Sequence, residues 1–204
     1  PAERLEPLHC DRVAQVASLR HVASGRALRV ANTHLTVAHP SNDHDIPLHR
    51  PLQMEQVLRA VLRGGGGSCA FVCADMNCDH LETEGPAVGR TDQWGRTASR
   101  AFTAAEVGAP VRMAFEAGFQ SAFHALHPGV RAVSHTSAYA QDGCVDYVFF
   151  REGDAHVFDA FLHPREVPPE TPWSRGAGWG TLEGTLSDHR PLVVDFQIRE
   201  GACE

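Results

Sequence analysis

The feature that most constrains the fold is a short, unbroken apolar run, SCAFVCAD, at residues 68–75. An apolar run of this length that ends in an acidic residue is typical of a buried strand. It therefore predicts the central strand of a sheet, and the other elements of the chain must be arranged around it.

The rest of the chain supplies both strands and helices. Residues 12–22 and 26–35 are two strand-like runs joined by Ala-Ser-Gly, which predicts a hairpin. The apolar residues of segment 48–63 have mostly helical spacing, and four glycines follow it as a helix stop. The other predicted elements are helices at 98–107 and 111–123, a hairpin of strands 144–150 and 155–162, and a last strand at 191–196. Helices mixed with hairpins favour an α/β sandwich with mainly antiparallel pairing over a doubly wound parallel sheet.

Composition narrows the classes of function. The chain has 204 residues, of which 43% are hydrophobic, and this suits an ordinary globular domain with a real core. Its formal charge of −7 argues against a protein that holds nucleic acid through positive charge alone. An enzyme that binds a short stretch of nucleic acid in a cleft, with metal ions supplying positive charge, remains compatible with this composition.

Cysteine use and hydropathy give expectations about location. The six cysteines form no CxxC pair and no zinc-type spacing. We therefore expect free, buried thiols in a reducing compartment, and hence an intracellular, cytoplasmic protein. No apolar run approaches the length that spans a bilayer, so we expect no membrane segment.

Polar groups collect at the ends of four predicted strands. They are Asn32 and His34 in VANTHL, Asp75 and Asn77 in FVCADMN, Asp146 in CVDYVF, and the adjacent pair Asp188 and His189 before the last strand. Taken alone, most of these residues are ordinary turn or capping residues. Asp146 is different, because a carboxylate between Val and Tyr in a strand is costly unless it is paired, and an imidazole is its natural partner. In a layered fold, such strand ends converge on one rim.

Together, and in this order, the four motifs resemble the C-terminal motif series of the endonuclease/exonuclease/phosphatase superfamily. That superfamily comprises metal-dependent phosphodiesterases and phosphatases with a two-sheet αββα sandwich. Within it, LRVANTHL, RPLQM, GCVDYVFF and LSDHRPLVVDF look most like the deadenylase branch, which includes nocturnin and the 2′-phosphodiesterase. The resemblance covers most of the chain, with residues 79–109 outside it.

The resemblance implies a role for each polar residue of the first two motifs. A phosphodiester repels hydroxide, so the enzyme has to neutralise its oxygens and orient one water in line with the leaving group. Asp75 would be the base or orienter of that water, and Asn77 would hold the water or a phosphate oxygen. His34 would contact the scissile phosphate or assist the leaving oxygen.

The last two motifs imply the charge-stabilising and metal-binding groups. His189 would stabilise the developing charge as imidazolium, and Asp146 would fix its tautomer. Asp188 would be a carboxylate ligand to Mg²⁺, with Mn²⁺ as a possible substitute, or would orient a water on the metal. Asn32 and Arg50 are candidate substrate-binding residues. Packing or support of the site is the alternative role for Arg50 and for Gln53, its partner in the family's Arg-x-x-Gln pattern.

One part of the family pattern is missing. The family opens with an Asn-bearing strand and a later strand that ends in Leu-Gln-Glu, whose Glu is the main magnesium ligand. No Glu fits that place, because Glu3 and Glu6 lie in a polar leader and Glu55 lies on the predicted helix. We therefore expect residues 1–204 to be the C-terminal part of one such domain, to need the missing N-terminal part as a partner, and to be inactive alone.

The motifs leave the substrate open. The first expectation is a Mg-dependent 3′-exoribonuclease of deadenylase type that acts on RNA by in-line attack of an activated water. The same residues would also serve a small-molecule phosphoesterase acting on sphingomyelin, a phosphoinositide or a nucleotide phosphate. A non-catalytic scaffold with the same fold is the third alternative.

Overall fold

A computed structural model describes most of the chain. The described residues are 2–9, 12–36, 46–63, 67–79, 108–130, 132–137, 140–165, 179–181, 184–187 and 189–199. The predicted helix at 98–107 and Asp188, the residue expected to bind the metal, lie outside these ranges. None of the described helices has the length and apolar character needed to cross a bilayer.

The main element is a six-stranded sheet in the order β1-β2-β3-β4-β8-β5. Its strands are β1 (Ala2–Leu8), β2 (Arg12–Arg20), β3 (Ala27–His34), β4 (Cys69–Asp75), β8 (Asp146–Phe150) and β5 (Gln120–Ser121). Strands β3 and β4 pair in parallel, and every other neighbouring pair in this sheet is antiparallel. The apolar run predicted to be central is β4, and most of its residues are buried.

The hairpin predicted over residues 12–35 is confirmed. Strands β2 and β3 pair antiparallel from Ala14 opposite Thr33 to Arg20 opposite Ala27. Gly25 adopts φ +70 in the connecting turn, a conformation in which a side chain would be strained.

Residues 2–9 differ from the expected polar leader. Residues Ala2–Leu8 form the edge strand β1, which pairs antiparallel with β2. The segment was missed because polar residues dominate it and leave no clean alternation. Leu8 nevertheless reaches the core, whereas Leu5 points away and is 67% exposed.

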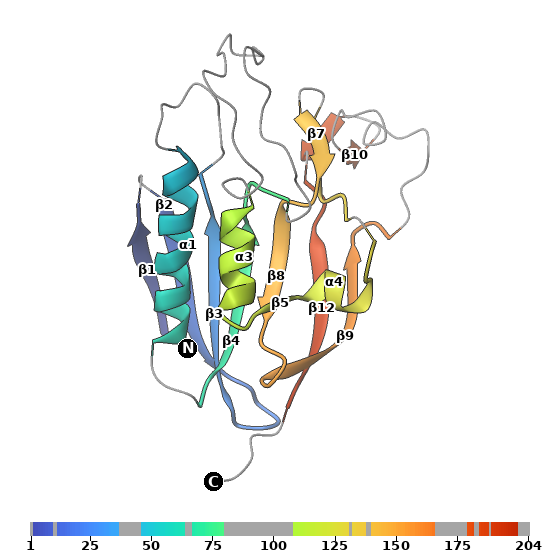
Figure 1. Ribbon diagram of the computed structural model, residues 1–204. Coiled ribbons are helices and arrows are strands. Elements are labelled where there is room, and N and C mark those ends of the chain that lie inside the picture. Colours follow the sequence, from blue (N-terminus) through green and yellow to red (C-terminus); the bar gives the residue numbers. More distant parts are fainter. Residues whose placement is uncertain are drawn as a thin grey trace.

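Two helices lie side by side on one face of this sheet (Figure 1). They are α1 (Ile46–Leu62) and α3 (Ala109–Glu116). Met54, Val57 and Val61 of α1 are fully buried, so this face forms the principal core. The predicted helix at 48–63 is therefore confirmed.

The helix predicted over residues 111–123 is instead two short helices separated by a turn and strand β5. Gly118 has φ +81 and ends α3, with Phe119 N donating to Ala114 O at 3.0 Å and Gly118 N to Phe115 O at 2.9 Å. This bond pair is the Schellman arrangement that closes a helix. Strand β5 follows, and then α4 (Ala122–Leu126).

A second, two-stranded sheet packs against the other face. It consists of β12 (Leu192–Ile198) paired antiparallel with β9 (Ala155–Leu162). The Phe196 ring of β12 lies 4.9 Å from that of Phe71 on β4 and 5.5 Å from that of Phe150 on β8, centroid to centroid. Two small hairpins complete the described strands: β6 (His135–Ser137) with β7 (Ala140–Gly143), and β10 (Trp179–Thr181) with β11 (Gly184–Ser187).

The second sheet corrects one prediction and confirms another. Strands 144–150 and 155–162 do not form a hairpin, because β8 pairs with β4 and β5 while β9 pairs with β12. The turn at 151–154 carries the chain from one sheet to the other, and the rings of Phe150 and Phe196 pack against each other across the layers in a tilted arrangement. The expected α/β two-sheet sandwich with mainly antiparallel pairing is confirmed.

Candidate active site

Strand register places three of the polar residues in one row. His34 at the end of β3 lies opposite Asp75 at the end of β4, and Asp75 lies opposite Asp146 at the start of β8. Residues directly opposite one another in adjacent strands project to the same face. All three side chains therefore stand at one rim, on the face turned away from α1.

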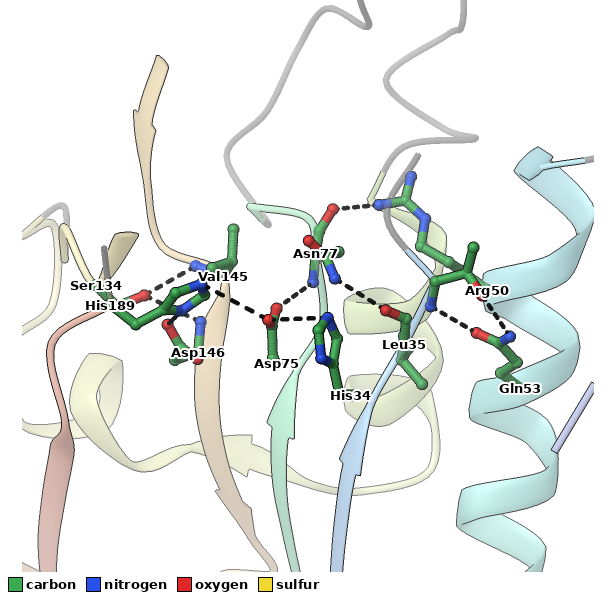
Figure 2. Close-up of polar contacts among 11 residues, drawn as sticks. His34, Leu35, Arg50, Gln53, Asp75, Asn77, Ser134, Val145, Asp146 and His189 are labelled. Atoms are coloured by element: carbon green, nitrogen blue, oxygen red, sulfur yellow. Dashed lines mark hydrogen bonds and ion pairs between the residues drawn. The ribbon is translucent and has the colours of Figure 1, made fainter. Parts of the chain in front are cut away.

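Asp75 is at the centre of the row (Figure 2). Its Oδ2 lies 3.3 Å from Nε2 of His34, and its Oδ1 accepts a 2.9 Å hydrogen bond from the backbone N–H of Asn77. The Asp75 side chain is only 15% exposed, whereas that of His34 is 56% exposed. The carboxylate is thus held on one side, and the imidazole beside it is open to a ligand.

His189 completes the row from the last strand of the chain. Its Nδ1 lies 2.8 Å from Oδ2 of Asp146, and its Nε2 lies 3.9 Å from Oδ2 of Asp75. An ionised carboxylate can only accept a hydrogen bond, so Nδ1 carries the proton and Nε2 faces the cavity side of Asp75. An isolated antiparallel bridge between His135 and His189 fixes the backbone at this point.

The environment changes the acidity of Asp75. Burial raises the pKa of this carboxyl above its ordinary value, and the neighbouring carboxylate of Asp146 raises the pKa further. The N–H of Asn77 and the imidazoles of His34 and His189 act in the opposite direction on the same pKa. A raised pKa brings a carboxyl closer to the range in which it accepts a proton from water.

Asn77 shapes the loop beneath the row. It is the only described non-glycine residue with a positive φ, at 49°. Its side-chain amide donates to the carbonyl of Leu35 at 2.9 Å, while Leu35 N donates to Asp75 O at 2.9 Å. Arg50, only 1% exposed, donates a hydrogen bond to Asn77 O. Both Asn77 and Arg50 therefore make contacts that hold the ends of β3 and β4 together.

The RPLQM segment of α1 extends this support. The Gln53 side chain is fully buried, donates to His9 O at 2.6 Å and to Thr36 Oγ1 at 2.7 Å, and accepts from Thr36 N at 2.9 Å. His9 follows β1 and Thr36 follows β3. One face of α1 thus ties down the chain after β1, β3 and β4.

Sequence reasoning missed Ser134. This residue is fully buried, and its Oγ accepts hydrogen bonds from the N–H groups of Val145 and Asp146, both at 3.0 Å. Its carbonyl accepts from Arg190 N at 2.7 Å. Ser134 therefore joins the segment that carries Asp146 to the segment that carries His189. Its position in an irregular stretch gives no periodic signal that could have pointed to it.

The row opens into a cavity of about 740 Å³. Its described lining residues are Leu5, Arg12, Val13, Gln15, Asn32, Thr33, His34, Cys73, Ala74, Asp75, Asp146, Tyr147, Val148 and Leu192. Asn32 lies on its wall with an exposed side chain, two residues down β3 from His34. Arg50 and Asn77 are not among these lining residues. The four described cysteines are all free thiols.

Asp75, Asp146 and His189 could also hold a cation, because one ligand atom from each lies within 4.8 Å of the others. Burial and, second to it, the facing carboxylate of Asp146 raise the pKa of Asp75, and a divalent cation between the two carboxylates would relieve their repulsion. Mg²⁺ takes about six ligands, mostly oxygens. These residues fit part of such a shell and do not complete it.

Known proteins are similar to this chain in structure more than in sequence. No family model matches the sequence, and no curated protein matches it. Among solved structures, the human nocturnin catalytic domain with bound sulfate is 19% identical with a TM-score of 0.59, covering 98% of this chain and 59% of that chain. A humanised TDP2 from D. rerio is 13% identical with a TM-score of 0.59, covering 97% of this chain and 66% of that one. An endonuclease/exonuclease/phosphatase protein from Bacteroides vulgatus is 18% identical with a TM-score of 0.54. The match covers 94% of this chain and 57% of that chain.

These similarities define the fold. The chain has the α/β sandwich fold of these endonuclease/exonuclease/phosphatase, nocturnin and TDP2 structures, so the fold that the motif resemblance implied is confirmed. The chain spans about three fifths to two thirds of the length of the three structures it matches.

Proposed function

We propose that this chain is the C-terminal part of a Mg²⁺-dependent phosphodiesterase, most similar in action to a 3′-exoribonuclease of deadenylase type. One observation carries the proposal: Asp75, Asp146 and His189 gather their ligand atoms within 4.8 Å at a strand-end rim, beside an exposed His34. A partly buried pair of carboxylates costs stability, and an acid–imidazole cluster in a cleft is characteristic of a catalytic site.

In this proposal each residue acts on a phosphodiester held in the cavity. Asp75, with its raised pKa, orients the attacking water and accepts its proton. His189, oriented by Asp146, presents Nε2–H as imidazolium to the phosphate oxygens as charge develops on them. His34 stands on the other side of Asp75, in reach of the leaving oxygen.

The proposed Mg²⁺ ion would bind at the same centre, which supplies part of its ligand shell. Asp75 and Asp146 would hold it, with Asp188 as the further carboxylate expected from the sequence, and Mn²⁺ would substitute. When bound, such an ion neutralises phosphate oxygens and so lowers the barrier to attack by an anion. RNA is the proposed substrate, and an intracellular, cytoplasmic location is part of the same proposal, supported by the free thiols.

A second candidate is a small-molecule phosphoesterase with the same centre. A cavity of about 740 Å³ lies within the range of roughly 300–1,000 Å³ that suits small ligands. The catalytic groups would be the same, so this alternative differs only in what fills the cavity.

We also propose that the complete domain includes an N-terminal part that covers the cavity face. Leu5 is 67% exposed and Val13 is 51% exposed on that face, and β12 pairs with only one described strand. The similar solved structures are longer than this chain. If the face is uncovered in the isolated 204-residue chain, the chain self-associates at high concentration. Monodisperse, monomeric behaviour in sedimentation would contradict this.

Activity assays separate the candidates. The complete protein is incubated with Mg²⁺ or Mn²⁺ and one of three substrates: 5′-labelled A-tailed RNA, a mixed-sequence RNA, or sphingomyelin. Stepwise shortening of the A-tailed RNA from its 3′ end is the expected result. Cleavage of sphingomyelin alone would favour the small-molecule enzyme. Cleavage of none of the three would favour a non-catalytic scaffold.

A further inference from the structure

The chain at the start of β6 contacts the proposed catalytic centre twice. Ser134 Oγ accepts hydrogen bonds from Val145 N and Asp146 N, as described above. The next residue, His135, is the first of β6, and its half-buried imidazole packs against the imidazole of His189. The two ring centroids are 4.7 Å apart, and the ring planes are tilted by 55°. None of the roles assigned above uses this second imidazole.

Main-chain contacts hold both histidines in place. His135 and His189 form an isolated antiparallel bridge. Next to the bridge, Arg190 N donates to Ser134 O at 2.7 Å. His189 N donates to Ser187 Oγ at 3.0 Å. The backbone therefore brings the two side chains together, and the orientation of each ring depends on what that ring contacts.

A single hydrogen bond does not fix the His189 ring. Its Nδ1 donates to Asp146 Oδ2 at 2.8 Å, whereas its Nε2 lies 3.9 Å from Asp75 Oδ2, beyond hydrogen-bond distance. The χ2 torsion of histidine is broad, so a ring held at one nitrogen can pivot about the line of that bond. Aromatic rings with centroids about 4.5–7 Å apart attract one another, so the packed ring of His135 opposes this pivot.

We propose that His135 is a positioning residue that holds the His189 imidazole with Nε2 directed at the phosphate beside Asp75. This inference rests on the proposed phosphodiesterase function and adds a residue to its machinery. Asp146 holds the His189 ring at Nδ1, and His135 holds it through the ring contact. Because small displacements of a catalytic group lower the rate strongly, both contacts are needed for full activity.

Steady-state kinetics of the complete protein, with Mg²⁺ and bis(p-nitrophenyl) phosphate, test this role. For His135→Ala, which removes the ring, we expect kcat to fall about tenfold with KM changed less than about twofold, because a misplaced group weakens transition-state stabilisation and not substrate binding. His135→Phe keeps a packed ring without its nitrogens and should retain most of kcat. His135→Gln keeps a polar side chain without a ring, and its kcat should fall as in His135→Ala.

A double-mutant cycle shows whether His135 acts through His189. In the His189→Gln background, His135→Ala should cause no further loss of kcat, because the imidazole that it holds is already gone. A further loss of about tenfold in that background would mean that His135 acts independently of His189, and the proposal would be overturned. Undiminished kcat in folded His135→Gln, or a kcat in folded His135→Phe as low as that of His135→Ala, would overturn it too.

A matched control removes a similar ring contact elsewhere. The rings of His9, after β1, and His49, on α1, also have centroids 4.7 Å apart. His9→Ala removes this contact and keeps the backbone hydrogen bonds of His9 with Gln53 and Gln56. It should leave kcat unchanged. If His9→Ala lowers kcat as much as His135→Ala does, the loss of any ring contact explains the effect, and the proposal is overturned.

Proton NMR of the complete protein separates this role from the proposed activity. The Nδ1 proton that His189 donates to Asp146 should give a far-downfield resonance, which His189→Gln assigns by removing it. We expect His135→Ala to weaken this resonance through faster exchange with water, and His135→Phe to retain it. Its absence from the unaltered protein, or its full persistence in His135→Ala, overturns the positioning role. If the resonance depends on His135 but the complete protein cleaves no phosphodiester, the positioning role stands and the proposed catalytic function fails.

Discussion

The two faces of the six-stranded sheet are built from the same strands and differ sharply. On the face under α1, the side chains of Ala14, Val16 and Ala31 are at most 2% exposed. On the opposite face, their sequence neighbours include Val13, which is 51% exposed, and the edge strand adds Leu5 at 67%. Alternation along a strand thus sends one set of residues to a closed core and the other to an open cavity.

The two faces therefore have different roles, one in the stability of the fold and the other in the proposed catalysis. The helix-covered face contains close-packed apolar side chains and the buried supports Gln53 and Arg50. The cavity face contains Asp75 and Asp146 side by side; the burial of Asp75 and, second to it, the neighbouring carboxylate of Asp146 are unfavourable for its ionised form and raise its pKa. Residues on the cavity face should therefore matter most for activity, and residues on the helix face most for stability.

The largest expected effect is on the cavity face, at His189. His189→Gln keeps a polar side chain but loses the imidazolium oriented by Asp146. We expect the rate of RNA hydrolysis by the complete protein to fall about 10²- to 10⁴-fold, the usual contribution of a catalytic imidazole. The exposed His156 on β9 is the matched control, and His156→Gln should retain the full rate. Equal activity of both variants would break the assignment of chemistry to this face.

The next effect contrasts the two faces in stability. Met54→Ala removes a fully buried side chain of α1 and should lower the free energy of unfolding by about 2–5 kcal/mol. Leu5→Ala on the open face should change it by less than about 0.5 kcal/mol in the 204-residue chain. Urea denaturation measures both. A large loss for Leu5→Ala in the complete protein, but not in the 204-residue chain, would show that the missing part covers this face.

A smaller effect, on both stability and activity, is expected at Ser134. Ser134→Ala leaves the N–H groups of Val145 and Asp146 without their acceptor. The expected cost is about 1–3 kcal/mol of stability. Because Asp146 is displaced, kcat should also fall, by about tenfold, with KM little changed. Ser134→Thr, which restores the hydroxyl, should recover most of kcat. Failure of that rescue, with a stable fold, would contradict a positioning role.

The smallest effect is a gain of stability from Asp75→Asn. The native-state pKa of Asp75 is raised, so the native state keeps this proton over a pH range in which the unfolded chain has lost it. The contribution of Asp75 to stability therefore falls as pH rises through that range, and at neutral pH the ionised carboxylate is destabilising. Without metal, Asp75→Asn should raise Tm by a few degrees at pH 7, since about 1 kcal/mol corresponds to ~2–4 °C in a domain of this size.

The pH dependence of that gain provides its control. The difference in Tm between the two proteins should shrink as pH falls below the ordinary Asp pKa of about 3.9, where the carboxyl is protonated in both states. Added Mg²⁺ should raise Tm of the unaltered protein more than that of Asp75→Asn. A lower Tm for Asp75→Asn across the whole pH range would contradict the raised pKa.

The sequence predicted those parts of the fold that have local signals. Strand β4 is an unbroken apolar run, which indicates a buried strand. Strands β2 and β3 are strand-like runs joined by a turn that contains glycine, which indicates a hairpin. The strand-end motifs also indicated which side chains would meet, and the register brings His34, Asp75 and Asp146 into one row.

Other features depend on contacts that local sequence does not encode. The turn after β8 is as short as a hairpin turn, but β9 pairs with β12 in the second sheet, where Phe196 of β12 packs against Phe150 of β8. The support from Ser134 is a hydroxyl in an irregular segment that contacts residues 11 and 12 positions away. Such groups can be identified only once the strands that they join have been placed.

The most direct test of the central claim is the rate of phosphodiester hydrolysis by the complete protein when Asp75 is changed to Asn. Bis(p-nitrophenyl) phosphate is a suitable substrate, with Mg²⁺ present and the fold checked by circular dichroism. We expect a folded protein whose rate has fallen by at least about 10²-fold. An undiminished rate in the folded Asp75→Asn protein would contradict the assignment of this rim as the active site.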